Sequence, residues 1–231
     1  MRLLLTSNGL SNQSIARAFL DVAGKDAKDI KVGFIPTAAM VEPGDKGWLI
    51  NDLANIQKLG CYVDIIDIGQ LSKDEWLPRL KTCDVIFVGG GNTFYLSYCM
   101  QKCGLFNMLP ELLETRMYAG ISAGSMVAAQ SLALASQALK NEEAFSDEDY
   151  DLLGPKGRSS GKTLQFVDFI FRPHLNSRYF TMAKKEILIE KTKHLDKPVY
   201  ALDDSSALKI IGNQIEVISE GEWILLNEDK L

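Results

Sequence analysis

Short apolar runs alternate with helical patterns along the first half of the chain, and this alternation constrains the fold more than any other feature. The expected strands cover residues 3–6, 30–35, 62–66, 84–88 and 117–121, and the expected helices cover residues 12–22, 46–59, 73–80, 92–101 and 109–116. Strands that alternate with helices form βαβ units, which place parallel strands in one sheet and helices on both of its faces. We therefore expect an α/β fold with a mostly parallel sheet. Ligands of such sheets bind at the carboxyl ends of the strands, so we expect the loops after Val88 and Ile121 to carry the chemistry.

The second half of the chain shows a different pattern. An acidic stretch at 141–151 and a stretch rich in glycine, serine and basic residues at 154–161 predict a loop. A strand-like run at 165–171, a helical pattern at 179–193 and a strand at 199–202 follow. Three further apolar runs, at 207–211, 214–218 and 223–226, are separated by Gly-Asn and Glu-Gly turns and predict an antiparallel meander. No repeat or linker divides the sequence, so we expect residues 1–231 to form one domain.

The composition excludes several classes of function. The chain carries 25 Lys and Arg against 30 Asp and Glu, and this formal net charge of −5 argues against nucleic-acid binding through a basic surplus. The four cysteines include no C-x-x-C pair, and two histidines cannot build a histidine-rich metal centre. No stretch approaches the roughly 18 apolar residues of a membrane span, and the first apolar run is too short for a signal peptide. We therefore expect a cytoplasmic protein, monomeric or homodimeric, without a metal, a cofactor, or a nucleic-acid or membrane partner.

The strongest motif is Gly-Ile-Ser-Ala-Gly at 120–124, a G-x-S-x-G sequence. It stands between an apolar run and a helix of small residues expected at 125–130, which is the strand–turn–helix context that a nucleophile elbow requires. The glycines allow two backbone segments to approach closely while Ser122 takes a strained turn that exposes its hydroxyl above the sheet. The backbone N–H of Ala123 would then help to stabilise an oxyanion. A small-residue turn that serves only tight packing is the alternative interpretation.

A serine nucleophile needs a base, and the chain offers two histidines. His194 lies near the end of an expected helix, where an exposed histidine interacts favourably with the helix dipole. His174 follows a strand and a proline, which places it at a strand end beside the expected site. The acid that orients the imidazole is expected at Asp203 or Asp204, which both follow the strand at 199–202. The spacing does not choose between them, and two adjacent acids also cap turns.

A run of three glycines, Gly89-Gly90-Gly91, follows a strand and opens the helix expected from Asn92. Glycine amides at such a turn supply either a second oxyanion donor or a phosphate-binding loop. The dinucleotide-binding pattern G-x-G-x-x-G is not met, because Phe94 stands at the position of the third glycine.

Taken together, these motifs resemble those of the peptidase E family of serine peptidases. The resemblance rests on segments that follow one another along the chain: Leu-Leu-Leu-Thr-Ser-Asn at 3–8, Phe-Ile-Pro-Thr-Ala at 34–38, Gly-Gly-Gly-Asn-Thr-Phe at 89–94, Gly-Ile-Ser-Ala-Gly at 120–124 and Pro-His at 173–174. It implies a three-layer α/β sandwich like that of class I glutamine amidotransferases, with a Ser–His–Glu triad. Peptidase E hydrolyses dipeptides with an N-terminal aspartate, and a related enzyme, cyanophycinase, cleaves an aspartate–arginine polymer.

The resemblance also implies roles for individual residues. Ser122 is implied as the nucleophile and His174 as the base. The family glutamate falls on Asp204, whose carboxylate is one methylene shorter. An aspartate does the same work where the backbone lies closer to the imidazole. The implied oxyanion hole consists of Gly90 or Gly91 together with Ala123.

Substrate recognition departs from the family pattern. Peptidase E has an arginine beyond its catalytic histidine that pairs with the substrate aspartate, and no arginine aligns clearly after His174. Arg178 is the nearest candidate, with Lys184 or Lys185 behind it, and arginine is better suited than lysine to bidentate carboxylate binding. Asn92 is expected to contact the substrate as well. We therefore expect a serine hydrolase that acts on short peptides as a dipeptidase or exopeptidase, with its preference for aspartate left open.

Two other classes of function are compatible with the sequence. One is a binding or regulatory protein that keeps the scaffold without peptidase activity. The other is an esterase or amidase that acts on non-peptide substrates. A glutamine amidotransferase would need a cysteine at the elbow, where this chain has Ser122.

Overall fold

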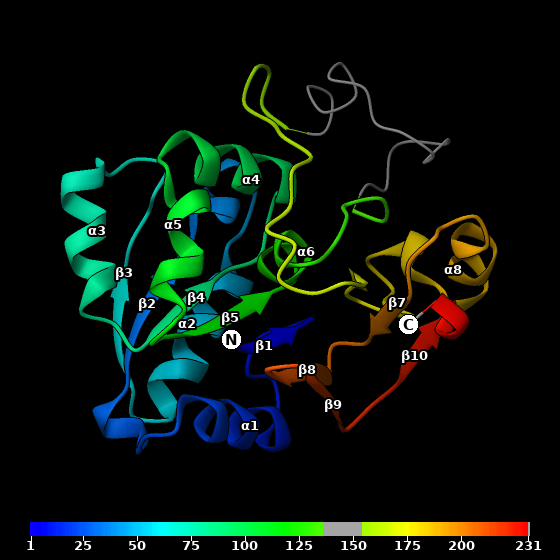
Figure 1. Cartoon of the computed structure of the whole chain (residues 1–231), viewed down its shortest axis with the longest axis horizontal. Coiled ribbons are helices and arrows are strands. Elements are labelled where there is room, and N and C mark those ends of the chain that lie inside the picture. The colour runs from blue at the N-terminus through cyan, green and yellow to red at the C-terminus, as the bar shows by residue number, and fades with distance from the viewer. Residues whose placement is uncertain (136–153, 231) are drawn as a thin grey trace.

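The structure is a computed structural model that describes residues 1–135 and 154–230. The strands of its main sheet are β1 Arg2–Thr6, β2 Lys31–Ile35, β3 Tyr62–Ile65, β4 Val85–Val88, β5 Met117–Ile121, β8 Ser206–Ile211 and β9 Gln214–Ser219. They lie in the order β3-β2-β4-β5-β1-β8-β9 (Figure 1). The strands β1 to β5 run parallel, β8 runs antiparallel to β1, and β9 runs antiparallel to β8. The prediction of a mostly parallel sheet is confirmed, and its antiparallel strands lie at one edge.

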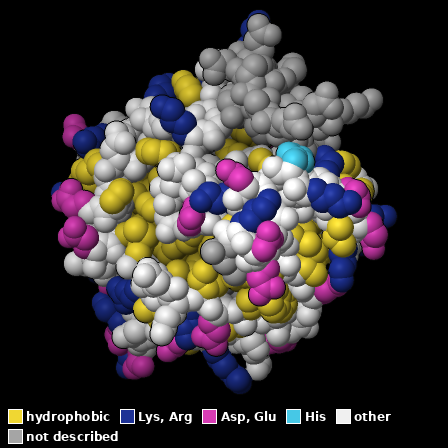
Figure 2. All heavy atoms as spheres, turned by 45° about the vertical axis from the view of Figure 1, so that its right-hand side comes forward, with side chains coloured by type: hydrophobic (Ala, Val, Ile, Leu, Met, Phe, Trp, Pro, Cys, Tyr) yellow, Lys and Arg dark blue, Asp and Glu magenta, His cyan; other side chains and the backbone are white. Residues whose placement is uncertain are grey.

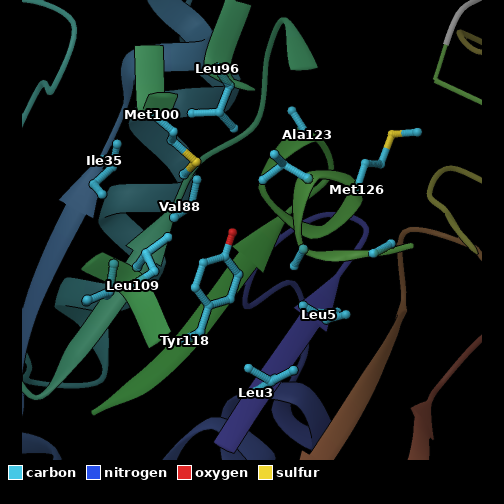
Figure 3. Close-up of a cluster of buried hydrophobic side chains, with 14 of the residues drawn as sticks. Leu3, Leu5, Ile35, Val88, Leu96, Met100, Leu109, Tyr118, Ala123 and Met126 are labelled. Atoms are coloured by element: carbon cyan, nitrogen blue, oxygen red, sulfur yellow. The ribbon is translucent and has the colours of Figure 1, made fainter. Parts of the chain in front are cut away.

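Helices cover both faces of the main sheet. One face is covered by α1 (Gln13–Ala23) and α2 (Gly47–Lys58), and the other by α3 (Lys73–Lys81), α4 (Thr93–Lys102), α5 (Leu105–Leu112) and α6 (Ala123–Ala128). Successive side chains of a strand point to opposite faces, so Leu4 joins the cluster under α1 and α2, whereas Leu3 and Leu5 join the cluster on the other face. Figure 3 shows part of this second cluster, with Tyr118 of β5 at its centre. The expected three-layer α/β sandwich is confirmed.

A second, smaller sheet is built from the C-terminal part of the chain. It consists of β6 (Ile170–Arg172), β7 (Val199–Leu202) and β10 (Trp223–Leu226), in the order β10-β7-β6. Strand β6 runs parallel to β7, and β10 runs antiparallel to it. Phe171 and Tyr200 pack on the core of the main sheet, whereas Val199 points to the opposite face, toward Leu188 of α8 (Lys185–Thr192). The small sheet therefore lies between the main core and α8.

The predicted antiparallel meander is wrong in its last strand. Strands β8 and β9 pair as expected, but β10 leaves the main sheet and pairs with β7. Asp203 holds the turn that precedes β10: its N–H donates to the Glu222 carbonyl at 3.0 Å, and its carboxylate accepts the Glu222 N–H at 2.6 Å. A side chain on Gly221 would overlap this carboxylate. These contacts, which no hydrophobic pattern encodes, direct the last strand to the small sheet.

Other predicted elements differ in extent, among them the helix expected at 125–130, which begins and ends two residues earlier as α6. The run at 165–171 forms a strand only from Ile170, because the N–H groups of Leu164 and Phe166 donate to carbonyls at the end of α6 instead. The helix predicted at 179–193 is confined to α8, after a short 3₁₀ turn. Helix α5 begins four residues earlier than expected, because Gly104 takes a left-handed conformation with φ 84° and starts it there. The acidic stretch at 141–151 lies outside the described residues.

Charged side chains of both signs are interspersed with apolar side chains on the face of the molecule in Figure 2. On that face, the formal net charge of −5 does not produce a continuous field of one sign. Among the described residues, no helix has both the length and the apolar character needed to cross a membrane.

Candidate active site

Ser122 stands at the sharp turn between β5 and α6. Its backbone has φ 46° and ψ −103°, a positive φ that is uncommon for a residue with a side chain and that persists only where its surroundings hold it. The flanking glycines are required by close packing. A Cβ on Gly120 would lie 2.6 Å from the Ser125 nitrogen, and a Cβ on Gly124 would overlap the Val88 carbonyl oxygen. The G-x-S-x-G sequence therefore forms the tight strand–helix turn of a nucleophile elbow.

The elbow is anchored to the end of β1. Thr6 accepts the Ser122 N–H at 2.9 Å and the Ser125 hydroxyl at 2.8 Å on its carbonyl oxygen, and its own hydroxyl donates to the Gly120 carbonyl at 2.8 Å. The buried side chain of Tyr118, which Figure 3 shows, also supports the elbow, because its hydroxyl donates to the Gly124 carbonyl at 2.6 Å. These bonds over-determine the turn and hold the strained serine in place.

Ser122, His174 and Asp204 are hydrogen-bonded in series. His174 Nε2 lies 2.9 Å from Ser122 Oγ, and His174 Nδ1 lies 2.6 Å from Asp204 Oδ1. His174 is 9% exposed, whereas the Asp204 side chain is 46% exposed. Each residue follows a different strand: Ser122 follows β5, His174 comes after β6, and Asp204 comes after β7. The structure thus brings together the three residues that the sequence indicated.

Two residues that sequence reasoning missed hold His174 in place, one through its main chain and one through its ring. The Ser7 hydroxyl accepts the main-chain N–H of His174 at 3.2 Å and donates to the Leu202 carbonyl at 2.8 Å, which ties the end of β1 to the chain at the ends of β6 and β7. The Phe180 ring stacks on the imidazole, with ring centroids 4.1 Å apart and planes 6° apart. Ser7 is detectable in principle, since it also follows a parallel strand. Phe180 carries no such signal, because its position depends on the turn after His174.

The adjacent acids Asp203 and Asp204 have different surroundings. Asp203 accepts the Ser205 N–H at 3.0 Å and the Ser206 hydroxyl at 2.6 Å, in addition to its bonds with Glu222. These bonds make Asp203 the centre of a turn. The Asp204 carboxylate instead contacts the imidazole, a difference that the sequence did not resolve.

The glycine loop (residues 89–91) passes beside the serine. A Cβ on Gly90 would lie 3.5 Å from the Cβ of Ser122. Gly91 has φ 127°, and a Cβ there would overlap the Ala38 backbone, so only glycine fits. Among the described residues, no backbone bond outside the helices and strands uses the N–H of Gly90 or Gly91. Ala123 opens α6, where the first N–H groups have no partner inside a helix. Backbone donors from two segments therefore lie beside Ser122.

The two predicted substrate contacts have other partners in this structure. The Asn92 side-chain oxygen accepts the Tyr95 N–H at 2.9 Å and caps the start of α4. Arg178 is exposed, donates to the Tyr179 hydroxyl and lies over its ring, 4.6 Å from the centroid. A substrate contact for either residue stays a prediction.

Other reactive groups are poorly suited to the chemistry. Burial raises the pKa of all four thiols, so they are protonated at neutral pH. Among the described residues, no group of three or more His, Cys, Asp or Glu side chains is placed to hold a metal ion. His194, the second histidine, is exposed after α8.

A parallel sheet that carries a strained serine at a strand–helix turn, with an imidazole on its hydroxyl, is the arrangement of a serine hydrolase. The comparison with known families agrees with this class. Residues 3–218 match the model of peptidase family S51. The chain belongs to this family and is a serine-type peptidase, and the resemblance to peptidase E is confirmed.

Individual relatives cover nearly the whole chain. An uncharacterised peptidase of Pasteurella multocida is 27% identical over 87% of this chain and 89% of its own length. Peptidase E of Streptomyces coelicolor is 29% identical over 93% of this chain and 82% of its own length. The crystal structure of a candidate peptidase E protein from Listeria monocytogenes has a TM-score of 0.77 at 24% identity, covering 95% of this chain and 98% of that one. The latter likeness establishes a shared fold.

Proposed function

We propose that the protein is a dipeptidase or exopeptidase that cleaves short peptides through a triad of Ser122, His174 and Asp204. The observation that carries this proposal is the hydrogen-bond series from Ser122 Oγ through the imidazole to Asp204. Membership of peptidase family S51 supports hydrolysis of a peptide bond. A relative named Peptidase E, together with the action of that family on dipeptides, supports short peptides as substrates.

In the first half of the reaction, Ser122 Oγ attacks the scissile carbonyl carbon while His174 Nε2 accepts the hydroxyl proton. Asp204 accepts a hydrogen bond from the Nδ1–H, which fixes the tautomer and stabilises the imidazolium. The backbone N–H groups of the glycine loop and of Ala123 stabilise the oxyanion. His174 then donates its proton to the leaving amine, the C–N bond breaks, and the acyl group stays on Ser122.

In the second half, water replaces the departed amine. His174 takes a proton from the water as its oxygen attacks the acyl carbon, and returns that proton to Ser122 Oγ when the ester bond breaks. The carboxylic acid product leaves, and the free enzyme is restored. An acidic side chain on the substrate would meet Arg178, the first cation beyond His174, and this pairing is our proposal for any preference for aspartate.

A dipeptide library with acidic, basic and neutral N-terminal residues tests this function. We expect turnover of some dipeptides by the wild-type protein and loss of at least about 10⁴-fold in Ser122→Ala, with unchanged circular dichroism. Ser14→Ala makes the same chemical change on α1, at a residue outside the triad; it is the matched control and should retain turnover.

A fluorophosphonate probe should label the wild-type protein and not Ser122→Ala, because the probe reacts with an activated serine. Wild-type turnover in Ser122→Ala would overturn the assignment of the nucleophile. Failure of the probe to label the wild-type protein would favour a binding or regulatory role. Hydrolysis of esters without hydrolysis of any peptide would favour an esterase.

A further inference from the structure

A carboxylate occupies a core position of α2. The buried residues of this helix are Leu49, Asp52 and Ile56, a spacing that points one face of the helix at the sheet. Asp52 is 4% exposed, and no hydrogen bond or ion pair joins its carboxylate to any other described residue. Burial without a partner raises the pKa of Asp52 to about 7. A buried, unpaired carboxylate is costly for a fold, and such groups are concentrated at functional sites.

The side chains of Asp52 and of Ile121, the residue that precedes the serine, both lie against Gly9. A Cβ on Gly9, in the loop after β1, would lie 3.1 Å from Asp52 Oδ1 and 3.1 Å from the Ile121 side chain. Ile121 is the last residue of β5, directly before Ser122. Asp52 is therefore under the edge of the sheet that carries the proposed nucleophile.

Trp48 lies one helical turn before Asp52 and faces the neighbouring loop. Its ring carbon Cζ3 lies 3.8 Å from the position of a Cβ on Gly90, in the glycine loop. Trp48 is 39% exposed, so its indole is partly open to solvent. Since β5 lies between β4 and β1 in the sheet, Trp48 and Asp52 meet the loops on either side of Ser122.

The Asp52 carboxylate is not completely enclosed by the protein. Among the described residues, the polar side-chain atoms that are both unpaired and fully enclosed are Trp76 Nε1 and Arg116 Nε. Asp52 is unpaired but is not in this group, so its carboxylate is not fully enclosed. A cationic ligand group bound at this carboxylate would supply the missing partner and remove the cost of burial.

We propose that Asp52, beside the indole of Trp48, binds an ammonium group on the acyl half of the substrate. This inference rests on the proposed peptidase function, and it makes Asp52 a specificity-determining residue. A dipeptide carries its α-ammonium on the same residue that contains the scissile carbonyl. A lysine-like side chain on the same residue would also carry a primary ammonium, at a greater distance from the scissile carbonyl. Both sources present a primary ammonium to one carboxylate.

The test compares substrates that differ only in this charge. The first pair is the best-cleaved dipeptide of the library and its N-acetyl form; the second pair has lysine or norleucine as its N-terminal residue. We expect the wild-type kcat/KM to favour the charged member of at least one pair, and Asp52→Asn to lower this preference by tenfold to a hundredfold, about the value of a hydrogen bond to a charged group. Loss in the first pair identifies the α-ammonium as the ligand, and loss in the second identifies the side chain.

Two controls separate binding from structure. Glu111→Gln makes the same chemical change at an exposed carboxylate on α5, on the opposite face of the sheet, and should retain the wild-type preference. Asp52→Glu restores the charge and should recover part of the preference. An equal loss on charged and neutral members of both pairs, or an unchanged preference in Asp52→Asn, would overturn the inference while leaving the peptidase in place. A wild-type protein that cleaves no peptide would instead refute the proposed function, and this inference would fall with it.

Discussion

At Asp203 and Asp204, two identical side chains acquire different surroundings from their neighbours on the turn after β7. The Asp203 carboxylate is occupied by two N–H groups and a hydroxyl, whereas Asp204 directs one oxygen to the imidazole at 2.6 Å. Hydrogen bonds to the charged form of a carboxylate stabilise whatever structure supplies the donors. Asp203 therefore supports the turn, and Asp204 is free to orient His174.

Substitution of each acid by asparagine should separate these roles. In Asp204→Asn the amide cannot stabilise the imidazolium, so we expect kcat to fall by roughly 10³- to 10⁴-fold with little change in stability. In Asp203→Asn we expect a smaller loss of kcat and a loss of unfolding free energy of about 1–3 kcal/mol, because two or three hydrogen bonds to a charged acceptor are weakened. Steady-state kinetics of both variants measure the loss of kcat, and urea denaturation measures the loss of unfolding free energy. The reverse ranking of kcat would reassign the triad to Asp203.

Asp52 should also change how the unfolding free energy depends on pH. Its carboxyl has a pKa of about 7 in the folded protein against 3.8 when unperturbed, because burial disfavours the charged form. Between these values the folded protein holds the proton more tightly than the unfolded chain, so this group destabilises the fold increasingly as the pH rises from about 4 to about 7. The amide of Asp52→Asn carries no such charge. We expect the variant to gain stability over the wild type at pH 8, by up to about 4 kcal/mol, and to gain little at pH 4.

Thermal or urea denaturation of both proteins at the two pH values measures this difference. Because only the difference between the proteins is compared, other titrating groups cancel to first order. An equal difference at pH 4 and pH 8 would show that Asp52 titrates near its ordinary value in the folded protein.

At the scale of elements, the nucleophile elbow depends on the close approach of α6 to β4. A Cβ at Gly124 would overlap the Val88 carbonyl oxygen, which is backbone and cannot rotate away. We expect Gly124→Ala to lower the unfolding free energy by about 3 kcal/mol or more, through forced separation of the helix and the strand. Gly44→Ala, where φ is 85° but no atom lies within 4 Å, should cost only the strain of the backbone, about 1 kcal/mol. Equal losses in urea denaturation would show that contact with Val88 does not limit this turn.

Helices and strands were predictable where residues close in sequence set their boundaries, through helix caps or through a continuous apolar run. Helix α1 begins where the Asn12 side chain accepts the Ile15 N–H, and it ends at Gly24, which has φ 68°. Strand β4 is buried at every position, so its apolar run marks it directly. Strand β10 was misplaced because its direction depends on bonds between Asp203 and Glu222, which are distant in sequence. The hydrophobic pattern determines whether a segment forms a helix or a strand, whereas contacts between residues distant in sequence determine which neighbour a strand pairs with.

In the candidate site, too, some residues were predictable from the sequence and others were not. Ser122 and His174 were identifiable because each follows a strand and has few competitors of its chemical type. Asp203 and Asp204 were not separable, since both follow the same strand and only the turn geometry distinguishes them. Phe180 and Asp52 were missed, although an acid at a core position of an amphipathic helix is a signal that sequence carries.

At the scale of the whole molecule, the site joins the two sheets. Ser122 follows a strand of the main sheet, and His174 follows a strand of the small sheet. Asp204 lies on the connection from β7 of the small sheet to β8 of the main sheet. Ser7 bonds to His174 and to the Leu202 carbonyl across the same boundary. The geometry of the triad therefore depends on how the small sheet rests on the main core.

Loosening the small sheet should consequently abolish activity before the main sheet unfolds. Leu188 of α8 is 1% exposed and packs in a cluster with Val199 and Ala201 of β7. Leu188→Ala leaves a cavity there and should cost about 2–5 kcal/mol, mostly by favouring local opening of the small sheet. In a urea series, we expect the midpoint for loss of turnover to fall further than the midpoint for loss of far-ultraviolet circular dichroism. Leu109→Ala makes the same change in the main core, where Leu109 is fully buried, and should lower both midpoints together. If the two midpoints also fall together in Leu188→Ala, the sheets unfold as one unit, and the site cannot be lost separately from the fold.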